Sequence, residues 1–370
     1  MPPIKVMFVA PSLGGGGAER VITILLRRLE RGRFLPSLVL FRREGAYLSD
    51  LPPDVPVFDC GRYGDGGRYR WIGRLVRLLR EKPPDVLVSF LWETSLISIP
   101  AALFAGTRRV VVSERLSIRG AREGLLKDIV RRFSIVALYR TVDRIIPNAL
   151  AMERQLVDDF HLPVRKIVTI PNPVEVEAII GKGTEPDPQG IRGIRVPVIA
   201  AMGRLSPQKG FDILLKAFAL LEKDCRLLLM GEGEEEKTLK EMASRLGIAE
   251  RVLFTGFLAN PYPALAGATL FVLSSRFEGF PNALVEAMVL GLPCISMRCP
   301  TGPEEIISDG ESGVLVPLGD PESLASAIDR LLGDSALRGR LGSRGKERAM
   351  EYEAAAIVRR YESLIESVVA

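Results

Sequence analysis

Short apolar runs alternate with helical patterns in two series along this 370-residue chain. Each series has six apolar runs of the length of a buried strand. In the first series they lie at 4–10, 38–41, 85–90, 110–113, 144–146 and 167–170, and in the second at 197–201, 226–230, 252–255, 269–274, 293–297 and 313–316. Strands that alternate with helices form parallel sheets covered on both faces. The order predicts an α/β protein built from two doubly wound domains.

One stretch separates the two series. From about 173 to 196 the chain is rich in Gly, Pro, Asp and Glu and has little apolar periodicity, which is typical of a linker. We therefore predict an N-terminal domain at 1–175, a linker at 176–195 and a C-terminal domain at 196–349. Two doubly wound domains in series predict a cleft where the carboxyl ends of their strands face each other.

The two halves differ in charge. Residues 1–180 hold 28 Lys and Arg against 19 Asp and Glu, a net charge of +9, whereas the remainder holds 22 against 26, a net −4, which together give the overall +5. A basic half predicts an anionic partner such as a phosphate, a lipid headgroup or nucleic acid, although an ordinary solvated surface has the same composition. We do not expect nucleic acid, because no aromatic interleaving or recognisable motif accompanies the charge.

The remaining bulk features predict a cytoplasmic protein. No segment has the length and apolarity of a membrane span, and the N-terminus does not resemble a secretory signal. The cysteines have no metal-ligand spacing, so we expect reduced thiols and no metal site. We also expect no cofactor. The cysteines are Cys60, Cys225, Cys294 and Cys299.

A basic loop follows the first strand of the second series. It reads Gly-Arg-Leu-Ser-Pro-Gln-Lys-Gly and begins at Gly203. Gly203 lets the chain leave the strand tightly, and Arg204 and Lys209 then lie at the mouth of the sheet beside a helix N-terminus. Fixed N–H donors and two cations suit a diphosphate. An ordinary surface loop is the alternative, but a basic pair at a strand end favours function.

A second loop pairs two glutamates. It runs from Phe277 to Glu286, and its Glu278 precedes a helix in which Glu286 lies one turn in. A carboxylate accepts hydrogen bonds from two hydroxyls, so the pair could hold a sugar and a ribose. Gly279 allows close approach of the backbone to a ligand, and the N–H groups at the helix start face sugar or phosphate oxygens. The alternative is a plain helix start with an incidental acidic residue.

Together these loops resemble the retaining glycosyltransferases of family 4, which have the GT-B fold of two Rossmann-like domains. That family also shows Gly-Gly-Ala-Glu-Arg, matched here from Gly16 to Arg20. Ile-Pro-Asn-Pro-Val at 170–174 and Met-Gly-Glu-Gly at 230–233 resemble further family segments. The resemblance extends over essentially the whole chain, and it implies that the final helix at 350–370 crosses back to the N-terminal domain.

The resemblance implies a role for each matching residue. Arg204 and Lys209 would neutralise the leaving diphosphate, Glu278 would bind the donor sugar, and Glu286 would hold the ribose. The backbone around Glu278, the start of the basic loop and the loop after the strand at 226–230 would complete the donor site. These donor-side positions are Gly203, Gly231, Gly233, Gly279, Phe280, Pro281, Asn282, Ala283 and Leu284. The glycines Gly15, Gly16 and Gly17 would line the acceptor side and approach the phosphates.

The implied reaction is transfer from a nucleotide diphosphate sugar, most commonly a uridine one, to a lipid-linked or glycan acceptor. The chain has no Asp-x-Asp motif and a single histidine, so we expect cations of the protein, and no metal, to stabilise the leaving group. We expect the acceptor to attack the face that the diphosphate leaves. A nucleotide-sugar 2-epimerase is less favoured because its acid–base chemistry usually needs several cleft groups. A non-catalytic nucleotide-sugar-binding protein is the third candidate.

One family feature is missing. Many members carry a histidine near the donor sugar, but His161 lies in a predicted turn, and we interpret it as structural. Glu114 and Arg115, in a Ser-Glu-Arg segment at a strand end, could replace it on the acceptor side. Thr301 and the following glycine, at another strand-to-helix turn, could contact the donor sugar or simply begin a helix.

Two basic amphipathic stretches lie in the first half, at 69–82 and 119–144. Such helices can lie on an anionic membrane, which would place the protein at the inner face of the cell membrane beside a lipid-linked acceptor. The alternative is a helix that faces the core and exposes its basic side to solvent.

Overall fold

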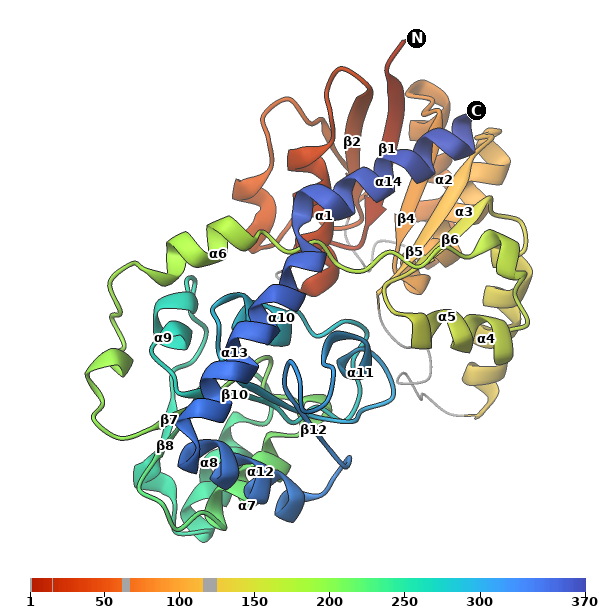
Figure 1. Cartoon of the computed structure of the whole chain (residues 1–370). Helices are drawn as coiled ribbons and strands as arrows, with labels where there is room; N and C mark the ends of the chain where they lie inside the picture. The colour runs from red at the N-terminus through yellow and green to blue at the C-terminus, as the bar shows by residue number, and fades with distance from the viewer. Residues whose placement is uncertain (1, 15, 62–66, 116–124) are drawn as a thin grey trace. The chain divides into compact units, whose positions relative to one another are not determined.

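The computed structural model describes residues 2–14, 16–61, 67–115 and 125–370, without the side chains of 67–69 and 125–127. The chain forms two compact units (Figure 1). The first contains residues 1–173 and 354–370, and the second contains residues 174–353. Each unit has one six-stranded sheet in which all pairings are parallel. The prediction of two doubly wound α/β domains is confirmed.

The first sheet has the strand order β3-β2-β1-β4-β5-β6. Its strands are β1 (Ile4–Ala10), β2 (Phe34–Leu40), β3 (Val57–Asp59), β4 (Val86–Phe90), β5 (Val110–Glu114) and β6 (Arg144–Pro147). Its helices are α1 (Gly17–Arg28), α2 (Gly67–Glu81), α3 (Trp92–Ala105), α4 (Leu125–Tyr139), α5 (Leu150–Asp158) and α14 (Ala354–Val369). Helices α1 and α14 share one apolar core with the sheet, and α2, α3 and α4 contribute to the core on its other face.

The second sheet has the order β12-β11-β10-β7-β8-β9, which repeats the topology of the first. Its strands are β7 (Val198–Met202), β8 (Arg226–Met230), β9 (Val252–Phe254), β10 (Leu270–Leu273), β11 (Cys294–Met297) and β12 (Val314–Val316). Its helices are α6 (Val176–Gly183), α7 (Phe211–Ala219), α8 (Glu236–Arg245), α9 (Tyr262–Ala266), α10 (Asn282–Val289), α11 (Pro303–Ile306), α12 (Pro321–Gly333) and α13 (Ser335–Ala349).

In both sheets the first and fourth strands of the series are neighbours, β1 with β4 and β7 with β10. The chain leaves these two strands toward opposite sides of the sheet. The loops that follow them therefore begin side by side at the carboxyl edge, which is where doubly wound proteins bind ligands.

The predicted linker at 176–195 is not a linker in the structure. Its first part forms α6, and the whole range lies inside the second unit. Val176 and Ile179 are buried in the core shared with α9 and α10. Two apolar residues one turn apart are too few to show a helical period in the sequence, which explains the misassignment. The chain passes between the units at 173–174 and again at 353–354.

Three strands also differ from the sequence prediction. Strand β2 begins at Phe34, four residues before the predicted start. Residues 167–170 form no strand, because Ile167 makes only an isolated bridge to Ile145 and Pro171 follows closely. Strand β3 was not predicted because it has only three residues, none of them fully buried.

The final helix, α14, is part of the first unit and lies beside α1 (Figure 1). Tyr361 and Ile365 are fully buried in the core that contains β1. On its polar side, Glu362 accepts a hydrogen bond from the main-chain N–H of Glu30 at 2.9 Å. No helix among the described residues has the length and apolarity needed to cross a membrane.

Replacement of Tyr361 tests how much α14 contributes to the first unit. Tyr361→Ala removes a fully buried ring and should lower the free energy of unfolding by about 3–5 kcal/mol. Ser363→Ala, on the exposed side of the same helix, should change it by less than about 0.5 kcal/mol. Urea unfolding with peptide-resolved hydrogen exchange measures both variants. If the first unit were equally protected from hydrogen exchange in the two variants, α14 would not contribute to its stability as proposed.

Candidate functional site

The basic loop and the glutamate loop of the second unit meet at its switch point. Residues 203–210 follow β7 and residues 274–281 follow β10, and these strands are paired. Lys209 Nζ lies 2.6 Å from Glu278 Oε1, an ion pair between residues 69 positions apart. The hydroxyl of Ser275 donates to the same oxygen at 2.7 Å. The structure thus brings together two of the three residues predicted to be catalytic.

Hydrogen bonds fasten the two loops to each other beyond the ion pair. The Gln208 side chain donates to the carbonyl of Phe277 at 3.0 Å, and the Ser274 hydroxyl donates to the carbonyl of Lys209 at 2.9 Å. Arg276 reaches across to Asp212, at the start of α7, with two bonds of 2.7 and 2.8 Å. Such two-point contacts between a guanidinium and a carboxylate fix orientation as well as distance. The switch point is therefore preorganised.

Arg204, the third predicted cation, is exposed at the start of the basic loop. Its guanidinium makes no hydrogen bond or ion pair within the part of the chain that the structure describes. Gly203, before it, leaves room for the lysine stem, since a Cβ there would lie 3.2 Å from Lys209 Cε. The loop thus presents one paired and one unpaired cation.

Glu278 lies in a shell of buried polar contacts. Its side chain is almost completely buried, and its main-chain carbonyl accepts a hydrogen bond from the Thr301 hydroxyl. Thr301 comes from the loop after β11, the strand that neighbours β10. This loop, which the sequence left open between a sugar contact and a helix start, packs directly on the glutamate loop.

The rest of the glutamate loop leads into α10. Gly279, Phe280 and Pro281 are buried, Asn282 and Ala283 are partly exposed at the first turn, and Leu284 lies in the core. The Phe280 ring contacts Tyr352 edge-on, with centroids 5.1 Å apart. Glu286 lies in the second turn of α10 and is buried.

The loop after β8 approaches the basic loop closely. Gly231 has φ of +139°, and a Cβ there would lie 2.0 Å from the Gly203 carbonyl oxygen. At Gly233 a Cβ would lie 2.3 Å from the carbonyl oxygen of Leu205. Because both carbonyl oxygens belong to the backbone, no side-chain rotation could relieve the collision of a Cβ at either position. These glycines let β7 and β8 present their loops together.

Sequence reasoning missed two residues near this site. Ser275 is fully buried against Glu278, and only its place three residues before the glutamate could have drawn attention to it. Phe257 is exposed although it is aromatic, and it directly follows Gly256, which is paired with Gly231. An exposed aromatic ring beside a glycine loop is a stacking surface for a flat ligand.

In the first unit, the glycine run follows β1 and leads into the N-terminus of α1. Gly16 is the N-cap residue of this helix and Gly17 its first residue; Gly15 lies outside the described residues. The helix start exposes main-chain N–H groups at the carboxyl edge of the sheet. This is the switch point of the first sheet, where β1 and β4 are neighbours.

Glu114 and Arg115 are both buried, on opposite faces of the first sheet. Glu114 accepts a hydrogen bond from the hydroxyl of Tyr139 on α4. The Arg115 guanidinium lies over the rings of Phe90 and Tyr361, at 5.5 and 5.6 Å. Successive residues of a strand point to opposite faces, which separates the two side chains.

Each of these side chains keeps one atom without a partner. Arg115 donates to the side chains of Ser113 at 2.9 Å and Asn172 at 3.0 Å, but its Nη2 has no hydrogen-bond partner among the described residues. The same holds for Glu114 Oε2. Burial raises the pKa of Glu114 to about 8, against the opposing effects of the Tyr139 hydrogen bond and the Arg115 charge.

His161 and the basic stretches can also be placed. His161 is exposed in the turn after α5 with φ of +48°. The stretch at 69–82 forms α2, whose Trp71, Leu75 and Leu79 are buried in the core while Arg77 is exposed, so α2 faces the core. Part of the stretch at 119–144 lies outside the described residues, and the rest includes α4.

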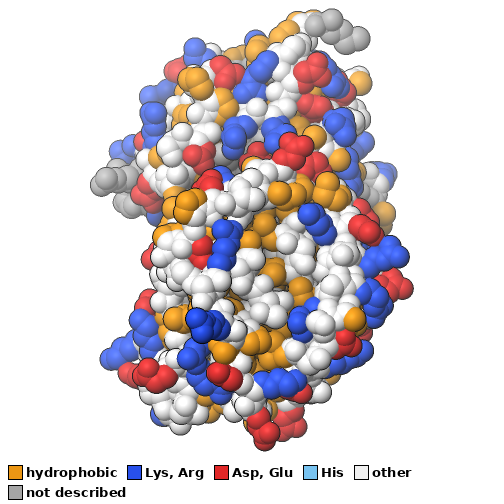
Figure 2. Space-filling model, turned by 60° about the vertical axis from the view of Figure 1, so that its left-hand side comes forward, with side chains coloured by type: hydrophobic (Ala, Val, Ile, Leu, Met, Phe, Trp, Pro, Cys, Tyr) orange, Lys and Arg blue, Asp and Glu red, His pale blue; other side chains and the backbone are white. Residues whose placement is uncertain are grey.

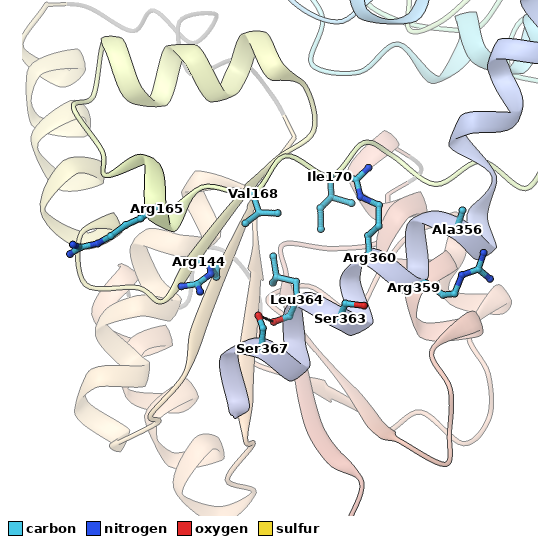
Figure 3. A pocket seen from close by; sticks show the side chains of 10 residues that line it. All are labelled: Arg144, Arg165, Val168, Ile170, Ala356, Arg359, Arg360, Ser363, Leu364 and Ser367. Atoms are coloured by element: carbon cyan, nitrogen blue, oxygen red, sulfur yellow. Dashed lines mark hydrogen bonds between the residues drawn. The ribbon is translucent and has the colours of Figure 1, made fainter.

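A surface pocket of about 660 Å³ lies in the first unit. One of its lining residues, Ile170, accepts a hydrogen bond from Arg115 Nη1 at 3.3 Å. The pocket is lined by α14 and by residues around β6, including Arg144, Arg165, Arg359 and Arg360. Their guanidinium groups point in different directions around the rim (Figure 3), so they do not converge on one anion. On the face shown in Figure 2, basic and acidic side chains are intermingled. The described residues contain no group of three or more His, Cys, Asp or Glu arranged to hold a metal.

Two family models match the chain. The model of glycosyl transferases group 1 matches residues 192–348, and that of Glycosyltransferase Family 4 matches residues 15–178. The N-terminal and C-terminal halves therefore match the same class of enzyme. The chain belongs to the family 4 glycosyltransferases of GT-B fold, and it is a glycosyltransferase.

Individual relatives agree with this family. The chain is 28% identical over 357 residues to the N-acetylgalactosamine-N,N'-diacetylbacillosaminyl-diphospho-undecaprenol 4-alpha-N-acetylgalactosaminyltransferase of Campylobacter jejuni, a match that covers 94% of this chain and 95% of the relative. The lipopolysaccharide core biosynthesis glycosyltransferase LpsE of Rhizobium meliloti is 40% identical over 151 residues, 41% of this chain and 44% of LpsE. Among solved structures, HepE of Anabaena in complex with UDP-glucose has a TM-score of 0.85 at 23% identity, covering 98% of this chain and all of that one.

The close approach at Gly231 gives a prediction with a matched control. Gly231→Ala combines a positive φ with a collision against backbone, whereas Gly247→Ala has φ of +70° and open space around the new Cβ. Gly247→Ala should cost about 1–2 kcal/mol of unfolding free energy. Gly231→Ala should cost more and should shift the β7 loop, weakening ligand binding. Urea unfolding measures the free energy of unfolding of the two variants, and nucleotide titration measures their ligand binding. Equal losses of unfolding free energy in Gly231→Ala and Gly247→Ala would contradict the close approach.

The raised pKa of Glu114 predicts how stability changes with pH. Because the carboxyl binds its proton more tightly in the folded state, its contribution is complete below about pH 4.5 and declines as the pH rises toward about 8. Glu114→Gln has no such titration, so its stability relative to the unmodified protein should increase from pH 5 to pH 8. Urea unfolding at both values tests this. Relative stability of Glu114→Gln that stays the same at both pH values would contradict the raised pKa of Glu114.

Proposed function

We propose that this glycosyltransferase transfers a hexose or N-acetylhexosamine from a UDP-sugar, with retention of configuration and without a metal ion, to a lipid-linked or polysaccharide acceptor. The ion pair of Lys209 with Glu278 at the switch point is the observation on which the proposal depends. The Campylobacter relative is named for an undecaprenol-diphosphate acceptor, and the Anabaena structure contains UDP-glucose. Both names support these classes of acceptor and donor.

The diphosphate would bind the two cations of the basic loop. A lysine ammonium has three N–H donors, so Lys209 can keep its bond to Glu278 and still donate to a phosphate oxygen. Arg204, exposed at the start of the loop, supplies a second cation. As the bond from sugar to phosphate breaks, negative charge develops on the leaving group, and fixed cations stabilise it without reorganisation.

The donor sugar and nucleoside would occupy the loops on either side. Glu278, held by Lys209 and Ser275, accepts hydroxyls of the sugar, helped by the N–H groups that begin α10. Glu286 would hold the ribose. Gly231 and Gly233 allow the base to approach the backbone, and Phe257 offers a ring for it to stack on.

On the acceptor side we propose the glycine run and Arg115. Gly16 and Gly17 begin α1, and N–H groups at this helix N-terminus attract phosphate oxygens. We assign Gly15, which precedes them in the sequence, to the same loop. Arg115 keeps an unpaired Nη2 among the described residues. Glu114 would act indirectly, by holding α4 on the sheet through Tyr139. The acceptor attacks from the face that the diphosphate leaves, and the enzyme works in the cytoplasm at the inner membrane face.

Thermal stability with a panel of nucleotides tests the donor site. UDP at about a hundred times its dissociation constant should stabilise the protein by about 2.7 kcal/mol, more than GDP, ADP or dTDP at equal concentration and equally with or without Mg²⁺. Arg204→Ala with Lys209→Ala should abolish the shift. In transfer assays each single variant should lose roughly 10²- to 10³-fold in kcat.

Lys237→Ala with Arg245→Ala provides a matched control, because it removes the same charges from the exposed surface of α8. This variant should bind UDP normally. Selective stabilisation by GDP would reassign the base, and dependence on Mg²⁺ would refute the metal-free mechanism. A folded protein that no nucleotide stabilises would refute the proposed donor site.

A further inference from the structure

Helix α4 exposes apolar side chains where a surface helix normally exposes polar ones. Ile129, Val130 and Phe133 are 56, 57 and 74% exposed. Positions i, i+1 and i+4 lie on one side of a helix, so the three form a continuous stripe. We call Ile129, Val130 and Phe133 the outer face of α4.

One basic residue of α4, Arg131, is held against the protein instead. Arg131 lies over the ring of Trp92 at 5.4 Å and pairs with Asp128 at 2.8 Å, and its side chain is only 13% exposed. Arg132 lies over the ring of Phe160 at 5.6 Å and donates to a main-chain carbonyl, but it remains exposed. For this stretch the sequence left two readings open, a helix that lies on an anionic membrane and a helix that faces the core and exposes its basic side. Because Arg131 is turned inward and apolar residues are exposed, the second reading describes α4 only in part.

The rotation of α4 is fixed by its inner side. Ile135 and Tyr139 are completely buried, and the Tyr139 hydroxyl donates to the buried Glu114 of β5. The helix therefore cannot turn its outer face inward without breaking a buried hydrogen bond and exposing two large side chains. Exposure of the outer face is a stable property of this unit.

Further apolar side chains and cations lie on the elements next to α4. At the end of α3, which contacts α4, Leu103 and Phe104 are 58 and 68% exposed. The exposed Arg80 donates to the Phe104 carbonyl at 2.9 Å, and Arg108 is exposed just beyond. Within the described part of the chain, neither arginine pairs with a carboxylate. Residues 103–140 contain nine Lys and Arg but only three Asp and Glu.

We infer that the outer face of α4 inserts into an anionic phospholipid bilayer, with the surrounding arginines bound to lipid phosphates. Apolar side chains combined with net positive charge are what a helix needs to lie in the headgroup region of such a bilayer. This inference rests on the proposed function, because it assigns the surface by which the enzyme would reach a membrane-held acceptor.

Cosedimentation with vesicles tests the inference directly. The unmodified protein should bind phosphatidylcholine vesicles that contain phosphatidylglycerol at least about tenfold more tightly than phosphatidylcholine alone, and salt should weaken this binding. Phe133→Ser and Ile129→Ser should each reduce the partition constant severalfold, and together by more than about tenfold. Leu220→Ser should not, although Leu220 is 55% exposed in the second unit.

The outcomes separate this inference from the donor site. Failure of the unmodified protein to bind anionic vesicles, or unchanged binding by the double variant, would overturn the inference. Concentration-dependent dimerisation that Phe133→Ser abolishes, without vesicle binding, would overturn it in favour of self-association. Stabilisation by UDP, measured on the same proteins, reports on the donor site alone. If UDP does not stabilise the unmodified protein, the proposed function is refuted and the vesicle result is unaffected.

Discussion

The pairing of β7 with β10 determines almost everything about the donor site. In a parallel sheet wound in both directions from its centre, the two central strands are neighbours although some seventy residues separate them. Each ends at the same edge, so the residues that follow are forced together before any side chain is considered. Lys209 and Glu278 use this proximity, and Gln208, Ser274 and the Arg276–Asp212 pair hold it in place.

An ion pair between a cation and a carboxylate in the unliganded protein has a clear physical benefit. A buried carboxylate without a partner is costly, and Lys209 and Ser275 remove that cost for Glu278. The lysine retains two further N–H donors, so a diphosphate could bind without breaking the pair. Glu278 would then keep its orientation throughout the reaction, and the site would need little rearrangement when the sugar arrives.

The fold could be predicted from the sequence because the apolar runs of the strands and their order define a doubly wound sheet. The same order predicts that the basic loop and the glutamate loop meet at one edge of the second sheet. Strands β1 and β8 have the predicted limits, since Pro3 and Pro11 flank the first and Gly231 ends the second. Short or irregular elements such as β3 and α6 have too few apolar positions to show a period. The role of Ser275, the exposure of Phe257 and the exposed apolar stripe of α4 depend on which neighbour each side chain meets. A single sequence contains no record of such tertiary contacts.

The place of α14 also has a consequence for how the chain folds as it is made. Synthesis proceeds from the N-terminus, and domains generally fold in that order. The first unit, however, lacks Ile357, Tyr361 and Ile365 from its core until α14 has been synthesised, which happens only after the whole second unit. The second unit, at 174–353, is complete earlier. While the second unit is being made, the N-terminal half therefore has one face of its sheet incompletely covered, and this face is closed only when α14 has been synthesised.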